Sequence, residues 1–311
     1  MPTPEFFRRP PPARPTVAQL VSFGAREFDA AGLSYGHGTG DARDDAAALV
    51  FHALALDHAD AEVAYALHPQ AAQVEQVLSL FAERLRRRVP AAYLMGRMWF
   101  AGLEFEVDPR VIVPRSPFAE LIVAGFQPWL DPARVLRIVD IGTGSGCIAI
   151  ACAVRFPTAT VDAVDLSPDA LEVAGRNVAR HGVASRLQLH QGDVFQPLAG
   201  RVYDLIVSNP PYVSDTEMAA LPAEYQHEPD MALRAGGDGL DVVRRLLREA
   251  DAHLASGGIL VVEVGDSDER LQRAFPGVPF LWLEFEHGGG GVFLLTKDDL
   301  HRHRRELSGT G

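Results

Sequence analysis

The sequence predicts an α/β protein in which a small all-α N-terminal domain precedes a mostly parallel, Rossmann-like β-sheet. Three observations support this fold class. Residues 16–90 place apolar side chains at helical spacing, residues from Val135 onward alternate apolar β-branched runs with helical segments, and a glycine-rich turn joins the first run to its helix. Strands that alternate with helices form a parallel sheet with helices on both faces.

The first 90 residues are expected to be helical apart from their beginning. Residues 1–15 are rich in proline and predict a disordered arm. Apolar side chains then recur at helical spacing, as in the stripe that contains Val77, Leu78 and Phe81. The segment at residues 35–39, Tyr-Gly-His-Gly-Thr, interrupts this pattern and predicts a loop. We therefore predict a small all-α domain over residues 16–90.

A β-hairpin linker is predicted over residues 91–115. Trp99, Phe100, Leu103 and Phe105 surround Gly102, a pattern typical of two short strands joined by a turn. A β-branched run follows and ends at proline 114. The linker separates the helical domain from the sheet domain, for which we predict the bounds 116–300.

Seven apolar runs supply the strands of the predicted sheet. They are residues 135–141, 160–165, 187–191, 204–208, 259–264, 280–286 and 292–296. The last two are joined only by a short link that contains four consecutive glycines, so this pair must be antiparallel. Residues 301–311 are expected to form a flexible tail.

Composition and charge narrow the classes of function. The net charge of −12 argues against direct nucleic-acid binding, because proteins that grip a nucleic-acid backbone usually show a basic face. No apolar run approaches the roughly twenty residues of a membrane helix, and the prolines near the start do not fit a secretory signal. Cys147 and Cys152 share one predicted helix and are unsuited to a disulfide, and no metal-ligand spacing occurs. We expect a cytoplasmic protein with no metal and no membrane contact.

A glycine-rich turn after the first predicted strand indicates a nucleotide-type ligand. Glycines at this place let the backbone turn sharply and let a ligand lie against it. A dinucleotide site would place a pyrophosphate on the following helix, but the acidic residue before the turn would repel that group and suits a cation instead. We therefore favour S-adenosylmethionine over NAD. Its first binding segment would comprise Asp140, Gly142, Thr143, Gly144, Ser145 and Gly146.

Two further acidic residues follow the next two strands. Asp165 ends the second strand, where a carboxylate can accept hydrogen bonds from both ribose hydroxyls of an adenosine. Asp193 follows the third strand, where a carboxylate can accept from the adenine amine while apolar neighbours cover the ring. The candidate cofactor-binding residues in these two segments are Asp165, Leu166, Asp193, Val194 and Phe195.

The most specific motif is Asn209-Pro210-Pro211-Tyr212, directly after the strand predicted over residues 204–208. Ligands of open α/β sheets bind beyond the carboxyl ends of the strands, so this tetrapeptide should face the cofactor and Asn209 should border it. The side-chain oxygen of Asn209 and the main-chain oxygen of Pro210 can hold both hydrogens of an NH₂ group. The prolines stiffen the loop, and Tyr212 can stack on a planar group. The motif predicts methyl transfer to an amide-type nitrogen, catalysed mainly by positioning.

With these motifs the sequence resembles the HemK-type (PrmC-type) family of protein N5-glutamine methyltransferases. Residues 140–146 are similar to motif one of the seven-stranded class I methyltransferases, and residues 209–212 are similar to the Asn-Pro-Pro-Tyr signature of amino-methyltransferases. Residues 90–96, and Pro114-Arg115 followed by Glu120, resemble other segments of the family. The resemblance covers nearly all of residues 16–300. It implies a seven-stranded sheet, a helical domain that contacts the substrate protein, N5-methylglutamine as product, and Arg115 as a residue that shapes the substrate site.

Details within the family resemble the branch that methylates a glutamine of the large-subunit ribosomal protein L-three. These details are residues 35–39, the segment Val-Pro-Arg-Ser-Pro at 113–117 and the segment His-Glu-Pro at 227–229. The expected partner is then a basic ribosomal protein, either free before assembly or already in a ribosome. An acidic enzyme would attract such a partner over a distance.

Three alternatives remain open at this point. The same reaction on a glutamine of peptide chain release factors requires no change in the motifs. A nucleic-acid amino-methyltransferase shares the Asn-Pro-Pro-Tyr signature, but it needs a basic face and usually a base-flipping pocket. A non-catalytic binding module with the same fold is disfavoured by the intact motif at residues 209–212.

Overall fold

The structure is a computed structural model that describes residues 7–8, 13–57 and 60–309. The chain divides into two compact units. The helical unit contains residues 1–98, 107–109 and 222–227, and the sheet unit contains residues 99–106, 110–221 and 228–311. Most of the predicted arm at residues 1–15 lies outside the described residues. Within that arm, Phe7 is buried and packs edge-on against Phe23.

The helical unit consists of short amphipathic helices, and its described residues contain no strand apart from the start of the hairpin. Helix α1 (Val17–Ala30) begins with a capping box in which Thr16 and Gln19 satisfy each other's backbone amides. The apolar faces of the helices meet in a core of their own, in which Phe28 and Phe81 pack edge to face. The other helices are α2 (Ala42–Leu54), α3 (Ala61–Ala66), α4 (Ala71–Arg87) and α5 (Ala91–Met95).

A buried charge cluster fixes a distant segment of the chain inside the helical unit. Arg84 on α4 is 1% exposed and pairs with Asp45 on α2 at 2.7 Å and with Glu224 at 3.5 Å. Glu224 is 0% exposed and also accepts from Arg88 at 3.0 Å and from the backbone amide of Ser34 at 3.1 Å. It belongs to the short helix η4 (Ala223–His227), which follows the Asn-Pro-Pro-Tyr motif in sequence. The sequence did not predict this insertion.

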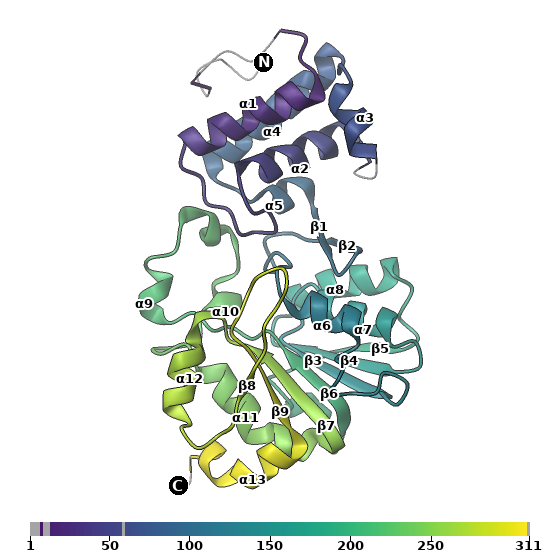
Figure 1. The fold of residues 1–311 in the computed structure, drawn as a ribbon, viewed down its shortest axis with the longest axis vertical. Helices are drawn as coiled ribbons and strands as arrows, with labels where there is room; N and C mark the ends of the chain where they lie inside the picture. The colour runs from purple at the N-terminus through teal and green to yellow at the C-terminus, as the bar shows by residue number, and fades with distance from the viewer. Residues whose placement is uncertain (1–6, 9–12, 58–59, 310–311) are drawn as a thin grey trace. The chain divides into compact units, whose positions relative to one another are not determined.

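The hairpin and the sheet match the predicted architecture. Strands β1 (Arg97–Phe100) and β2 (Leu103–Glu106) form a two-stranded sheet around Gly102. The main sheet has seven strands in the order β5-β4-β3-β6-β7-β9-β8, which confirms the predicted seven-stranded, mostly parallel fold (Figure 1). Its strands are β3 (Arg137–Ile141), β4 (Thr160–Asp165), β5 (Leu187–Gln191), β6 (Tyr203–Ser208), β7 (Leu254–Glu263), β8 (Leu281–Trp282) and β9 (Val292–Thr296). As predicted, the last pair is antiparallel.

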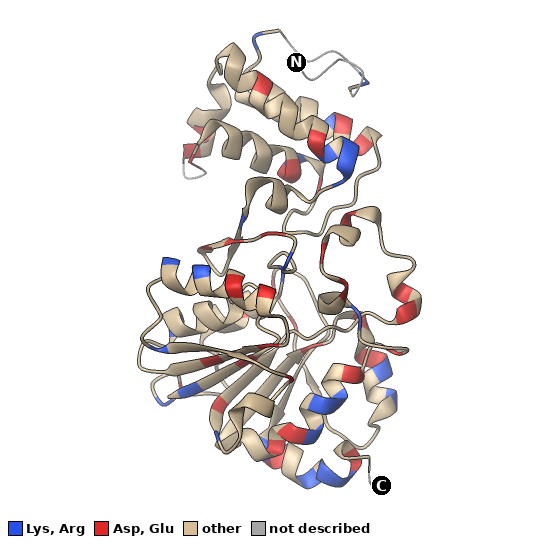
Figure 2. Ribbon diagram, turned by 180° about the vertical axis from the view of Figure 1, so that it is seen from behind, with Lys and Arg blue, Asp and Glu red and all other residues tan. Residues whose placement is uncertain are grey.

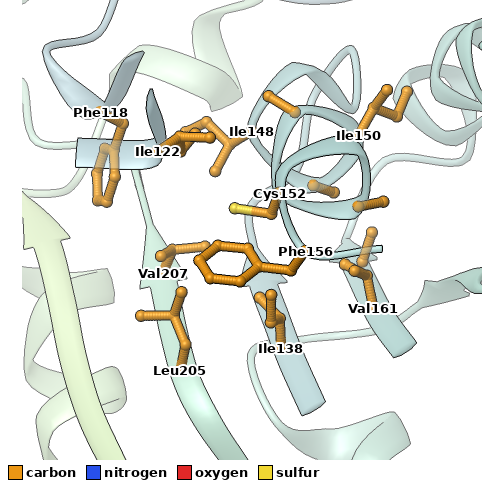
Figure 3. Packing of buried hydrophobic residues seen from close by; sticks show 14 of the residues in the cluster. Phe118, Ile122, Ile138, Ile148, Ile150, Cys152, Phe156, Val161, Leu205 and Val207 are labelled. Carbon is orange, nitrogen blue, oxygen red and sulfur yellow. The ribbon is translucent and has the colours of Figure 1, made fainter. Parts of the chain in front are cut away.

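Helices cover both faces of the sheet. On one face lie α6 (Phe118–Ala124), α7 (Cys147–Arg155) and α8 (Pro168–Arg180), and on the other lie α11 (Asp241–His253), α12 (Asp268–Ala274) and α13 (Lys297–Leu307). Figure 3 shows the ring of Phe156, at the end of α7, lying over Ile138, Leu205 and Val207. Cys147 and Cys152 are both buried and free, so they act as small apolar residues in this layer.

The C-terminal residues differ from the prediction of a flexible tail. Helix α13 runs to Leu307, with Leu300 and Leu307 buried against the sheet unit's core and Thr296 capping its start. The prediction was wrong because charged residues dominate this segment. The two leucines are seven residues apart, which places them on one helical face. Figure 2 shows that basic and acidic residues are interspersed on the helices near the C-terminus, and Lys297 pairs with Asp251 at 2.8 Å.

The buried charge cluster predicts a large loss of stability on removal of its cation. Arg84→Met should lower the free energy of unfolding by about 3–5 kcal/mol, because the two buried carboxylates Asp45 and Glu224 would each lose one cationic partner. Arg86→Met on the same helix is the matched control, since Arg86 is largely exposed and pairs with Glu83 on the surface. That control should change the free energy by less than about 1 kcal/mol. Denaturant unfolding of both variants tests this, and equal losses would contradict the structural role of Arg84.

Candidate active site

The parallel pairing of four strands gathers polar residues at one edge of the sheet. Ser208, the last residue of β6, lies opposite Ile141 of β3 and Val262 of β7. Its hydroxyl donates to the main-chain oxygen of Ile141 at 2.7 Å. The residues that follow these strand ends therefore meet at the carboxyl edge, where open α/β sheets bind ligands.

A cavity of about 430 Å³ opens at this edge. Among the residues that line it are eight of the predicted site residues: Gly142, Gly144, Asp165, Leu166, Asp193, Val194, Asn209 and Pro211. The glycine-rich turn forms one wall, with positive φ at Gly142, Gly144 and Gly146. A Cβ built on Gly144 would meet no atom within 4 Å, so the backbone there is open for a ligand to lie against.

Five other predicted cofactor residues lie behind the wall of this cavity and not on its surface. Phe195, expected to pack near an adenine, is 2% exposed and stacks on His253 at 4.4 Å within the core. The apolar character of residues 194–195 predicted a ring contact, but of these two residues only Val194 lines the cavity. The remaining four are Asp140, Thr143, Ser145 and Gly146.

Asp140 is a fully buried carboxyl group with one oxygen lacking a hydrogen-bond partner among the described residues. Its Oδ2 accepts from the hydroxyl of Thr143 at 2.6 Å and from the backbone amide of Ala149 at 3.2 Å, whereas Oδ1 has no partner. Burial raises the pKa of Asp140 to about 7, because desolvation disfavours its charged form. A cationic group beside Oδ1 would compensate that charge.

Asp165 organises the glycine-rich turn and also faces the cavity. Its carboxylate accepts from the backbone amide of Gly144 at 2.8 Å and from that of Ser167 at 2.9 Å. Burial raises its pKa, although these two amides oppose the shift. The carboxylate keeps further lone pairs for ligand hydroxyls, because each oxygen can accept more than one hydrogen bond.

The opposite wall contains residues that the sequence did not predict. Asp193 pairs with Arg245 of α11, which lines the cavity as well. Val194 has a φ of +50°, a strained backbone for a β-branched residue and therefore a sign of a functional constraint. The wall is completed by residues on either side of the motif segments: Arg110, Val111, Ile112, and Pro229, Asp230, Met231 and Ala232 at helix α10 (Asp230–Leu233). In the sequence, the β-branched run before Pro114 was the only indication of Arg110, Val111 and Ile112 as site residues.

A second, much smaller cavity of about 20 Å³ shares a wall with the first. Asn209, Ile112 and Ala232 line both cavities, so Asn209 stands between them. The smaller cavity is lined besides by Pro210, Tyr212, Arg115, Val213 and Leu233. The three predicted residues Asn209, Pro210 and Tyr212, together with Arg115, thus come together around this small space.

Tyr212 is held in place from several sides. A Cβ on Gly265 would lie 2.6 Å from its ring, and a Cβ on Gly239 would lie 2.4 Å from its main-chain oxygen, so both positions require glycine. That main-chain oxygen also accepts from the hydroxyl of Ser267 at 3.2 Å. Gly265 and Ser267 belong to the short helix η5 (Gly265–Ser267), directly after β7.

Two buried carboxylates support the small cavity, and the sequence predicted neither as a site residue. Glu228 binds the guanidinium of Arg115 with both oxygens, one at 2.6 Å, and accepts from the backbone amide of Val113 at 2.9 Å. Glu263 ends β7 and accepts from Ser116 at 2.5 Å and from the hydroxyl of Tyr212 at 3.3 Å. Burial raises the pKa of Glu263 to about 7. The His-Glu-Pro segment at 227–229 was a signal for Glu228, whereas Glu263 lay unmarked at the end of an apolar strand.

No group of three or more His, Cys, Asp or Glu side chains in residues 7–8, 13–57 and 60–309 is arranged to hold a metal ion. Across those same ranges, no helix has the length and apolar character needed to cross a membrane.

Comparisons with known proteins identify the family of the chain. The family model of the methyltransferase small domain matches residues 126–238, which include the glycine-rich turn and the Asn-Pro-Pro-Tyr motif. A ribosomal protein uL3 glutamine methyltransferase of Xanthomonas campestris is 48% identical over 94% of this chain and 95% of its own length. Proteins of the same name from Xylella fastidiosa and Bordetella pertussis are 49% and 45% identical, over 94% and 92% of this chain and 94% and 96% of their own lengths. The chain therefore belongs to the family of ribosomal protein uL3 glutamine methyltransferases.

Proposed function

We propose that the protein transfers a methyl group from S-adenosylmethionine to the side-chain amide nitrogen of a glutamine in ribosomal protein uL3. The products would be N5-methylglutamine and S-adenosylhomocysteine, with one proton released. The observation that carries this proposal is the position of Asn209 on the wall shared by a large and a small cavity. The names of the relatives support the choice of uL3.

The residues of the large cavity fit S-adenosylmethionine. Asp165 suits ribose hydroxyls, and the open backbone at Gly144 leaves room for the ligand. Asp140 lies behind the cavity wall, and its oxygen that lacks a partner would compensate a nearby cation. Leu166 and Val194 offer apolar surface to a planar base, with Asp193 beside them. When bound, the cofactor would supply an electrophilic methyl group.

The residues of the small cavity would position the acceptor. The side-chain oxygen of Asn209 and the main-chain oxygen of Pro210 would accept the two hydrogens of the glutamine NH₂, and Tyr212 would flank the planar amide. The lone pair of an amide nitrogen is delocalised, which makes the nitrogen a weak nucleophile. Fixed orientation would therefore supply most of the rate acceleration. Such positioning can contribute about 7–11 kcal/mol to lowering a barrier. No strongly basic group is needed, because the proton leaves after the methyl group arrives.

The charge of the protein supports a basic partner. A net charge of −12 would attract a ribosomal protein rich in lysine and arginine and would raise its rate of association. We infer that the reaction takes place in the cytoplasm, on uL3 that is free or already part of a ribosomal particle. The helical unit would contact that substrate.

Methyl transfer from labelled S-adenosylmethionine tests this function. Purified uL3 should become labelled on one glutamine, which mass spectrometry would identify, whereas purified release factors should not. Labelling of release factors without uL3 would contradict the proposed substrate.

Asn209→Ala should reduce turnover of uL3 by at least about 100-fold, because a misplaced acceptor loses the benefit of orientation. S-adenosylmethionine should still bind, since the glycine-rich turn and Asp165 are unchanged. Single-turnover assays and calorimetry measure the two effects. Retained turnover would remove Asn209 from the catalytic site.

The affinity for S-adenosylmethionine should depend on the ionisation of Asp140. Below the pKa of about 7 this carboxyl group is neutral, so binding of a cation must first remove its proton. The affinity should therefore be about tenfold weaker at pH 6 than at pH 8. Calorimetry at both pH values tests this. The variant Asp140→Asn should bind more weakly and should show no such pH dependence; a dependence that persists would assign it to another group.

Gly265→Ala should impair turnover by displacing the ring of Tyr212. The added Cβ would lie 2.6 Å from that ring, and the backbone at Gly265 has a φ of +50°. Gly257→Ala is the matched control, with a φ of +77° and no atom within 4 Å of the added Cβ. Both variants should lose roughly 1 kcal/mol of stability from backbone strain. Only Gly265→Ala should lower kcat/KM for uL3, by about tenfold or more; equal activity of the two variants would contradict a role for the ring.

A further inference from the structure

Glu263 is a buried carboxylate whose hydrogen-bond partners all belong to the small cavity or its border. It is 5% exposed. It accepts from the hydroxyl groups of Ser116 at 2.5 Å and Tyr212 at 3.3 Å. The side chain of Asn209 and the charge of Arg115 also act on it, and both favour its ionised form.

Strand register places Asn209 beside Glu263. Strands β6 and β7 are parallel, and Ser208 lies opposite Val262. The next residues along the two strands, Asn209 and Glu263, therefore lie side by side at the carboxyl edge. Neighbouring strands are about 5 Å apart, so side chains that leave them in the same direction can touch.

An ionised carboxylate can only accept hydrogen bonds. The Asn209 side chain must therefore turn its NH₂ group towards Glu263, and its oxygen is left to face the small cavity. With the opposite orientation, two NH₂ hydrogens would face the cavity, which would then bind a carbonyl or carboxylate oxygen. The choice between these two orientations decides which chemical group the cavity accepts.

We propose that Glu263 is a positioning residue that fixes the orientation of the Asn209 amide and thereby makes the site select a glutamine over a glutamate. This proposal rests on the proposed function. Glu263 contacts neither the cofactor nor the substrate in this arrangement. It acts through Asn209, and through the hydroxyl of Tyr212 on its other oxygen.

The variant Glu263→Gln tests the proposal, because its own NH₂ group allows the Asn209 amide to turn round. The substrate is unmethylated uL3 with its acceptor glutamine, and the competitor is uL3 with that residue replaced by glutamate. Assays at pH 8 keep Glu263 ionised in the wild type. The preference is the inhibition constant of the glutamate form divided by KM for the glutamine form.

Glu263→Gln should lower this preference by about tenfold and kcat by about 10- to 100-fold, the range expected for one hydrogen bond to a charged group. The affinity for S-adenosylmethionine should stay unchanged. In the background of Asn209→Ala, Glu263→Gln should have no further effect on the preference, because the two residues act as one unit. A loss of turnover with an unchanged preference would show a merely structural role and overturn the proposal.

Asp204→Asn is the matched control for loss of a carboxylate. Asp204 is near the start of β6 and accepts from the backbone amides of Leu136 and Arg137 at 2.8 and 2.9 Å. This variant should keep the wild-type preference. If Glu263→Gln fails to fold, wild-type protein at pH 6 and pH 8 replaces it, because Glu263, with its pKa raised to about 7, is mostly protonated at pH 6 and can then donate a hydrogen bond. The preference should be lower at pH 6, and an equal preference at both pH values would overturn the proposal.

A spectroscopic readout separates this proposal from the proposed function. The NMR signal of the Asn209 side-chain NH₂, assigned by its loss in Asn209→Ala, should shift in Glu263→Gln and stay in place in Asp204→Asn. No substrate is needed for this measurement. If wild-type protein fails to methylate uL3, the proposed function fails, while the signal still decides whether Glu263 orients Asn209. An unshifted signal in Glu263→Gln would overturn the orientation itself.

Discussion

The in-register parallel pairing of β3, β4, β6 and β7 is the constraint on which the site depends. Hydrogen bonds between these strands fix where each one ends, and the apolar layers on both faces of the sheet keep the register from slipping. The residues that follow these strands therefore lie together at the carboxyl edge of the sheet. Asp165 and Asn209 reach the same cavity from different strands, although no hydrogen bond joins them directly.

Buried carboxylates serve two different purposes in this molecule. In the helical unit, Glu224 and Asp45 are neutralised by Arg84, so their charges contribute to holding one arrangement of the chain. At the carboxyl edge of the sheet, Asp140 and Glu263 rely mainly on neutral donors. Their raised pKa values follow from this incomplete compensation. Incomplete compensation is unfavourable for folding, and it is typical of groups that act on a ligand or on a neighbour.

Much of the fold and part of the site could be predicted because local patterns encode them. Alternating apolar runs indicated the seven strands, and the residue types in the motif at Asn209 indicated an acceptor for an NH₂ group. The placement of Phe195 in the core could not be read from its neighbours, because Val194 and Phe195 are both apolar and only Val194 lines the cavity. Glu263 and Arg245 were missed for another reason: each joins the site through pairing of elements far apart in sequence, for which a single chain offers no local signal. The buried leucines of α13 were hidden among charged residues.

The path of the chain through η4 has a consequence for how this protein could have evolved. The chain leaves the sheet unit after the Asn-Pro-Pro-Tyr motif, contributes Glu224 to the core of the helical unit and returns to supply Glu228. The two units are thus interlaced in sequence and not merely joined end to end. If the N-terminal part were exchanged for that of another enzyme, the buried Glu224 would lose its charged partners unless the new part also supplied arginines in place of Arg84 and Arg88. Because segments of the two units alternate along the chain, we expect the two units to be inherited together.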